Sequence, residues 1–235
     1  MTRDELMTSY DTSRASAQEI VALSGRSVGE RDMKRAADQL GVLAGGKFMI
    51  AEDGPGLRMI YDTVLFERNE KGVRPFDRFL AGPARSLPKE ALALASRLGQ
   101  AFFSLFRFSA KHDIVGLWIE DILDNDRRIW IISINLEDHD DPHEVFGMRI
   151  MDTGEFHIVL GPIALSTDEI AIDCTTAIKA LGRLPFERPL SVAIYGLILT
   201  KDLPDQQSKA KFLLSLARGF KKIDSLKQGK QAANG

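Results

Sequence analysis

The sequence predicts an α+β fold in which a mostly antiparallel β-sheet of about five strands is flanked by N-terminal and C-terminal helices. Five segments between residues 101 and 160 are rich in β-branched and aromatic residues that alternate with polar ones. Short polar turns separate these segments, and helical periodicity precedes and follows them. The segments are 101–108, 113–119, 128–134, 145–150 and 155–160. The flanking helices should cover one face of the sheet, which could close partly into a small barrel.

The length of the chain allows two domain organisations. Its 235 residues can bury a sizeable core without disulfides or metal. One organisation divides the chain into a helical N-terminal region, 1–100, and a β core with C-terminal helices, 101–235. The other is a single domain that contains all of these elements.

Charge and cysteine content narrow the class of protein. A net charge of −2 and a pI near 6.1 predict no strong overall attraction to nucleic acid or to a membrane surface. The single cysteine, Cys174, excludes an internal disulfide and a multi-cysteine zinc site. The N-terminus lacks the apolar core of a signal peptide, and the longest apolar stretch, 190–199, is about half of a bilayer span. We therefore expect a soluble, cytoplasmic protein without a membrane span.

The helices before the sheet are predicted from caps and periodicity. Residues 1–15 are polar and aperiodic, so we expect a mobile arm there. Capping boxes at Ser16–Glu19 and Ser27–Glu30 indicate helix starts, and the second helix should end at Gly45-Gly46. Further helices are expected at 57–68, at 75–82 and after Pro88.

The sequence after the sheet predicts two helices and leaves one apolar run between them unassigned. A third capping box at residues 166–169 predicts a helix to about Ile178, ended by Gly182. The apolar run 190–200 fits either a buried helix or a strand, because periodicity cannot assign so short a run. From Pro204 the apolar residues recur at the spacing of an amphipathic helix.

The segment 137–144, between the third and fourth predicted strands, is the candidate metal site. It holds five carboxylates and two imidazoles, which are ligands for a divalent cation. The spacing matches neither an EF-hand loop nor a helical zinc motif, since Pro142 disfavours a helix through the preceding residue. The alternative is a solvated acidic turn. The candidate ligands are Glu137, Asp138, His139, Asp141 and His143.

The C-terminal segment is the candidate surface for a partner. Between Lys209 and Lys230 there are seven basic residues and one aspartate. A basic amphipathic helix can contact another protein, an acidic surface or, with weaker support here, nucleic acid. The alternative is that these cations only favour the helix dipole and solubility. The candidate contact residues are Lys209, Lys211, Arg218, Lys221 and Lys222.

Other motifs favour structural roles. Residues 41–48 match the P-loop pattern except at Phe48, where a magnesium-binding hydroxyl is required. Cys174 has no histidine close in sequence and is expected to be a buried apolar residue. The aromatic residues of segment 101–108 are expected in the core, since the RNA-binding signature is absent. His112 and His157 are expected at the surface, at a turn and on the less buried strand face.

The β core resembles a group of bacterial proteins of unknown function, mostly from alphaproteobacteria, over about residues 60–165. The resemblance lies in segments 103–107, 116–123, 130–132, 135–137, 146–150 and 156–157. It implies a bacterial cytoplasmic protein and brings no activity, ligand or catalytic residue.

These observations favour a non-enzymatic binding module that needs no cofactor and uses the basic C-terminal helix as its contact surface. The alternative is a metal-dependent enzyme that uses segment 137–144 with a divalent cation. A third alternative is a small apolar ligand inside the β core.

Overall fold

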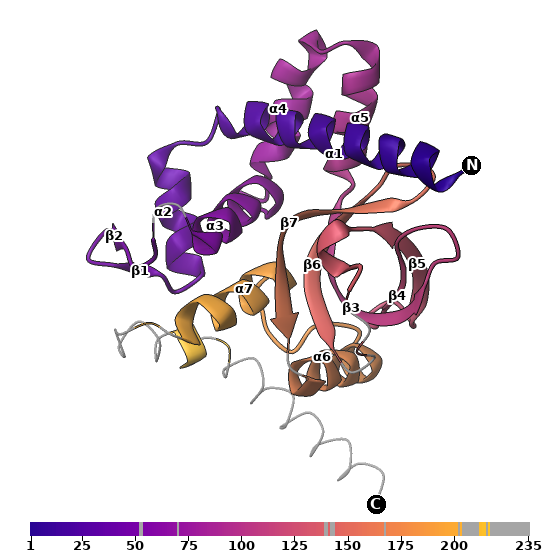
Figure 1. The fold of residues 1–235 in the computed structure, drawn as a ribbon. Coiled ribbons are helices and arrows are strands. Elements are labelled where there is room, and N and C mark those ends of the chain that lie inside the picture. Colours follow the sequence, from indigo (N-terminus) through magenta and orange to yellow (C-terminus); the bar gives the residue numbers. More distant parts are fainter. Residues whose placement is uncertain are drawn as a thin grey trace, which may run out of the picture.

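The five predicted strands form a closed barrel in the computed structural model, with helices on one side and across one end (Figure 1). The structure describes residues 1–51, 54–69, 71–138, 141, 144–166, 168–201, 203, 212–214 and 216. The barrel strands are β3 (Phe102–Lys111), β4 (Leu117–Asp121), β5 (Arg127–Ile132), β6 (Val145–Asp152) and β7 (His157–Ser166). The predicted α+β class is confirmed.

Each barrel strand pairs with two others, in the order β3-β4-β5-β7-β6 and back to β3. Four of the pairs are antiparallel, and β5 with β7 is parallel and joins only two residue pairs. The contact that closes the barrel between β5 and β7 is therefore limited to Ile131 with His157 and Ile132 with Ile158.

Apolar side chains fill the barrel interior. Phe106, Ile119 and Met148 are almost completely buried and belong to one cluster that all five strands contribute to or contact. The expected core role of Phe102, Phe106 and Phe108 is confirmed, because Phe106 is buried and the other two pack against the same cluster.

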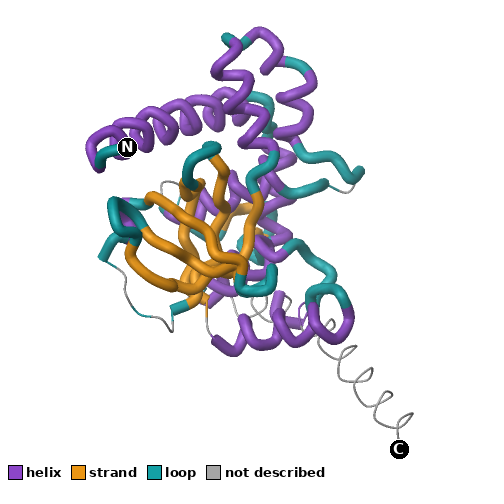
Figure 2. Tube along the Cα trace, turned by 90° about the vertical axis from the view of Figure 1, so that its right-hand side faces the viewer, coloured by secondary structure: helices purple, strands orange, loops and turns teal. Residues whose placement is uncertain are grey.

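The helices before the barrel are α1 (Arg3–Gly25), α2 (Glu30–Gln39), α3 (Pro55–Phe66), α4 (Pro75–Ala81) and α5 (Lys89–Gly99). A short hairpin of β1 (Leu43–Ala44) and β2 (Lys47–Phe48) follows α2, the 3-10 turn η1 (Pro83–Ser86) precedes α5, and η2 (Ile134–Leu136) follows β5. After the barrel come α6 (Asp168–Leu181) and α7 (Leu190–Lys201). Figure 2 shows helices above, beside and below the strands.

The expectation of a mobile arm over residues 1–15 is wrong, since α1 begins at Arg3. Thr2 and Glu5 form a capping box: the Glu5 N–H donates to Thr2 Oγ1 at 3.3 Å and the Thr2 N–H donates to Glu5 Oε2 at 2.7 Å. Leu6, Tyr10 and Ala17 then bury one stripe of the helix. This stripe is too sparse to reveal a helix by hydropathy, because small and polar residues stand between its members.

The predicted end of the second helix at Gly45-Gly46 is also wrong. Helix α2 ends at Gln39, and Gly41 takes the left-handed backbone conformation, with φ 76°. Gly45 and Gly46, both at positive φ, instead form the two-residue turn of the β1–β2 hairpin. A hairpin turn presents no phosphate-binding loop ahead of a helix, so the P-loop match has no structural support.

The ambiguous run 190–200 is the helix α7. Consecutive residues from Leu190 to Gly196 are buried, so the fold surrounds this part of the helix on every side. Such a helix carries no amphipathic pattern, which explains why its sequence could not distinguish it from a strand.

Candidate functional site

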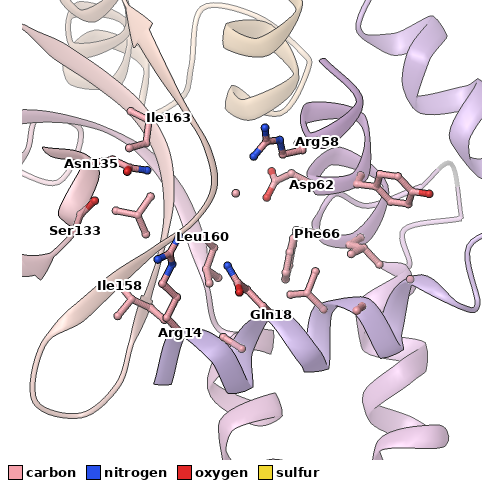
Figure 3. A pocket seen from close by; sticks show the side chains of 18 of the residues that line it. Arg14, Gln18, Arg58, Asp62, Phe66, Ser133, Asn135, Ile158, Leu160 and Ile163 are labelled. Atoms are coloured by element: carbon pink, nitrogen blue, oxygen red, sulfur yellow. The ribbon is translucent and has the colours of Figure 1, made fainter. Parts of the chain in front are cut away.

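A groove of about 660 Å³ lies between α1, α3 and strand β7 (Figure 3). Apolar side chains form much of its wall, and polar or charged side chains stand among them. The apolar members are Ala17, Val21, Ala22, Leu65, Phe66, Ile158, Val159, Leu160 and Ile163. The others are Tyr10, Arg14, Gln18, Gly25, Arg26, Arg58, Tyr61, Asp62, Ser133, Asn135 and Gly161. A volume of this size, lined by both apolar and polar side chains, is in the range of small-molecule sites.

The face of α1 toward the groove carries short side chains beside the longer ones of Arg14, Gln18 and Val21. Ala17, Ala22 and Gly25 lie on this face, and they recur at roughly helical spacing. A Cβ atom added at Gly25 would have nothing within 4 Å. Helix α1 therefore lies near α3 and β7 without filling the space between them.

A bulge in β7 forms the opposite wall. In the pairing of β6 with β7, Gly147 pairs with Ala164 and Arg149 pairs with Leu160. Residues 161–163 thus stand opposite Met148 alone, and Gly161 takes a φ of 68°. The bulge turns Gly161 and Ile163 toward the groove, and both line it.

Three arginines line the groove: Arg14 on α1, Arg26 at the C-cap of α1 and Arg58 on α3. All three are exposed at the rim. Within the part of the chain that the structure describes, none of them forms an ion pair. The groove therefore combines an apolar wall with uncompensated positive charge.

Asp62 is the carboxylate among the lining residues, and its charge is already compensated. Arg149 Nε donates to Asp62 Oδ1 at 2.9 Å, and an Arg149 Nη donates to Asp62 Oδ2 at 3.1 Å. The same guanidinium donates to Glu67 at 2.7 Å, and Ser191 Oγ donates to the same Glu67 oxygen at 2.6 Å. This network joins α3, β6 and α7 behind the groove wall.

The network is accompanied by shifts in the pKa of Arg149 and of Tyr195, which is buried nearby. Burial alone would lower the pKa of Arg149, but the attraction of Asp62 and Glu67 more than offsets it, so the pKa is raised. Burial, with Asp62 nearby, also raises the pKa of the Tyr195 hydroxyl well above its ordinary value. Arg149 is therefore a fixed cation, and Tyr195 stays protonated.

The predicted metal site lies partly outside the described residues. His139 and His143 are among the residues that the structure leaves undescribed. Glu137 lies 3.9 Å from Arg3 on α1, and Asp138 is exposed. The described part of the chain holds no group of three or more His, Cys, Asp or Glu that could bind a metal ion. Without its two histidines, the site stays a prediction.

The predicted partner surface lies outside the described residues as well. Lys209, Lys211, Arg218, Lys221 and Lys222 are all undescribed, so the basic segment also stays a prediction. Among the described residues, no helix has the length and apolar character to cross a membrane.

Sequence reasoning missed the groove. Its arginines, Arg14, Arg26 and Arg58, are spread over two helices that only the fold brings together. One local signal was available for α1: Arg14, Gln18, Ala22 and Arg26 recur every four residues, which places them near one side of a helix. The expectation of an arm over residues 1–15 hides that signal, because it excludes Arg14 from the helix.

The fold and the groove define an α+β protein built on a five-stranded barrel, with an arginine-lined pocket between barrel and helices. The chain belongs to a family of unknown function, DUF7986, whose model matches residues 4–173. This confirms the resemblance to a family of unknown function, and the matched region contains every residue that lines the groove. No curated protein and no solved structure matches the chain.

Proposed function

We propose that the protein is a non-enzymatic binding module whose groove between α1, α3 and β7 takes a small, negatively charged molecule. The observation that carries the proposal is the presence of Arg14, Arg26 and Arg58 around one groove, none of them in an ion pair among the described residues. An apolar wall supplies affinity, and a guanidinium supplies directed donors for a carboxylate, sulfonate or phosphate.

The test is a fluorescence titration of the full chain with anilinonaphthalene sulfonate, an aromatic anion. We expect saturable binding of one molecule per chain. Ala22→Trp, which places a large side chain in the groove, should weaken that binding at least about tenfold because it fills the apolar space. Ala15→Trp is the matched control, because Ala15 is exposed on α1 and does not line the groove. Equal binding by both variants would overturn the proposal.

The basic segment from Lys209 to Lys230 is proposed as a second contact surface, toward an acidic protein or another acidic surface. Its support is the excess of seven basic residues over one aspartate. The test replaces Lys209, Lys211, Arg218, Lys221 and Lys222 by Gln in the full chain. The variant should then elute from a heparin column at a lower salt concentration than wild type, because its binding releases fewer counterions. Unchanged retention would exclude these residues as the contact.

The alternative function, a metal-dependent enzyme that uses segment 137–144, rests on five carboxylates and two imidazoles in eight residues. Elemental analysis of protein purified without added metal is the direct measurement. Stoichiometric metal that is lost in a His139→Ala/His143→Ala variant would favour this alternative. Metal far below one ion per chain, with no stabilisation by added zinc, manganese or calcium, would exclude it.

A further inference from the structure

We infer that the groove binds an elongated organic acid with one charged end, and that its carboxylate lies beside Arg14 and Asn135. This inference rests on the proposed function and adds the ligand class and the orientation of the ligand. It follows from the length of the groove, the position of its neutral donors and the position of Asp62.

The groove is long in one direction. Its lining residues on α1 run from Tyr10 to Arg26. Sixteen steps at the helical rise correspond to about 24 Å along the helix axis. A volume of about 660 Å³ spread along such a length fits an extended chain better than a compact ring system.

Neutral hydrogen-bonding groups line the groove together with Arg14. Arg14 and Gln18 extend from α1 toward the strand side of the groove, where Ser133 and Asn135 also stand (Figure 3). Guanidinium, carboxamide and hydroxyl groups can all donate to the two oxygens of a carboxylate. This end of the groove therefore offers both charge and additional donors to one acidic group.

Asp62 disfavours an acid at the α3 side of the groove. Arg58 and Asp62 stand one helical turn apart on α3 and lie beside each other (Figure 3). The Asp62 carboxylate, although paired with Arg149, offsets part of the attraction that Arg58 exerts on an anion. Arg14 has no carboxylate among the residues that line the groove near it, so the acid is drawn to Arg14.

The apolar part of the ligand then lies toward Phe66. Leu65 and Phe66 line the groove on α3, and Val21 and Ala22 line it from α1. Beyond them, the open space at Gly25 leaves room for the end of a chain. Burying a methylene group stabilises a complex by about 0.8 kcal/mol, so an acyl chain of moderate length gives useful affinity.

Charge also argues against an occupant from the same chain. The C-terminal segment from Lys209 to Lys230 is strongly basic and would be repelled by Arg14, Arg26 and Arg58. A free acid carries the complementary charge and needs no segment of protein to order on binding.

Isothermal titration calorimetry on the full chain tests the inference with dodecanoate, dodecanol and dodecanedioate below their aggregation concentrations. We expect dodecanoate to bind at least about tenfold more tightly than dodecanol, which lacks the charge. Arg14→Gln should weaken dodecanoate binding roughly tenfold. Arg31→Gln is the matched control: it removes an exposed arginine of α2 that does not line the groove, and it should change affinity less than about threefold.

Several results would overturn the inference. These are equal affinity for dodecanoate and dodecanol, a loss in Arg31→Gln as large as in Arg14→Gln, and preferred binding of dodecanedioate, which has a carboxylate at each end. A dimer that dissociates in Ala22→Trp would also overturn it, because a second copy would then occupy the groove. Failure of the proposed function is distinct: anilinonaphthalene sulfonate would then bind Ala22→Trp and Ala15→Trp equally.

Discussion

Arg149 on strand β6 and Asp62 on helix α3 form a bidentate ion pair in which both side chains are buried, with exposed fractions of 3% and 4%. The guanidinium also lies over the Phe66 ring, 4.8 Å from its centroid. Asp62 and Phe66 both lie on α3 and line the groove. The ion pair with Arg149 therefore holds this wall of the groove against the barrel. The ion pair therefore connects the stability of the fold with the shape of the candidate site.

Replacing Arg149 by Met should destabilise the protein strongly. The substitution leaves Asp62 and Glu67 buried without their cation, and removal of one partner from a buried ion pair costs about 3–5 kcal/mol. Urea denaturation of the two proteins measures the difference in the free energy of unfolding.

Arg97→Met is the control for this prediction. Arg97 lies 4.0 Å from Asp152, and both side chains are largely exposed, so the loss should stay below about 1 kcal/mol. An Arg149→Met variant that lost no more than the control would show that the buried network is not what holds α3 to β6.

Gly116, just before β4, should not tolerate a side chain. Its φ is 81°, and an added Cβ would collide with the carbonyl group of Ile131 and the backbone of Ile132. Left-handed strain and overpacking together should lower the free energy of unfolding of Gly116→Ala by about 2–5 kcal/mol.

Gly45→Ala separates the backbone strain from the overpacking as causes of the destabilisation. Gly45 also has a positive φ, 55°, but nothing lies within 4 Å of an added Cβ. Its loss should be limited to about 1–2 kcal/mol of backbone strain. Equal losses at the two glycines would mean that β5 moves aside at Gly116, which contradicts a rigid contact between these backbones.

His157, at the start of β7, should make stability depend on pH below neutrality. Burial lowers the pKa of His157, and Asp152 opposes that shift only in part. A lowered pKa in the folded state means that folding favours the neutral ring, so its contribution is fully present above the unfolded pKa of about 6.5. That contribution is lost as the pH falls through the folded pKa.

The measurement compares wild type with His157→Gln by urea denaturation between pH 7.5 and pH 5. The stability of wild type relative to the variant should decrease as the pH falls. The reason is that the imidazole ring, which only wild type has, binds a proton more readily in the unfolded chain than in the fold. A relative stability that increased toward pH 5 would show that the charged ring is favoured in the fold. The comparison cancels the effects of the other titrating groups.

The sequence predicted the barrel strands well because strand alternation and polar turns are local signals. Phe106, Ile119 and Ile131 lie in the barrel core, as alternation requires. Closure of the barrel depends on β6 pairing with β3 and on the short parallel contact of β5 with β7. Those contacts join residues distant in sequence, and no local pattern encodes them.

The groove could not be predicted for the same reason. Arg14 and Arg58 look like ordinary surface cations on their own helices, and only the packing of α1 near α3 gives them a shared space. The buried role of Arg149 was equally hidden. Its sequence predicts a strand with one buried and one exposed face. Every residue of β6 except Asp152 is nevertheless buried, because helices cover the outer face of this strand.

Cys174 should be inert toward thiol reagents in the folded protein. The side chain is fully buried on α6, and burial, with a smaller contribution from Asp173, raises the pKa of its thiol to about 12. An ordinary cysteine has a pKa of about 8.5, so the thiolate fraction at pH 8 is roughly three orders of magnitude lower than usual. Reaction with dithionitrobenzoate should therefore be very slow in buffer and rapid in 6 M urea.

An Ile172→Cys/Cys174→Ala variant provides the matched comparison, because Ile172 lies on the same helix and is 63% exposed. Its thiol should react rapidly without urea, since neither burial nor access limits it. Fast reaction of Cys174 in native wild type would contradict the burial and would reopen a nucleophilic role for this residue. A reaction rate that instead follows the unfolding rate shows that Cys174 serves the packing of α6, as its sequence context predicts.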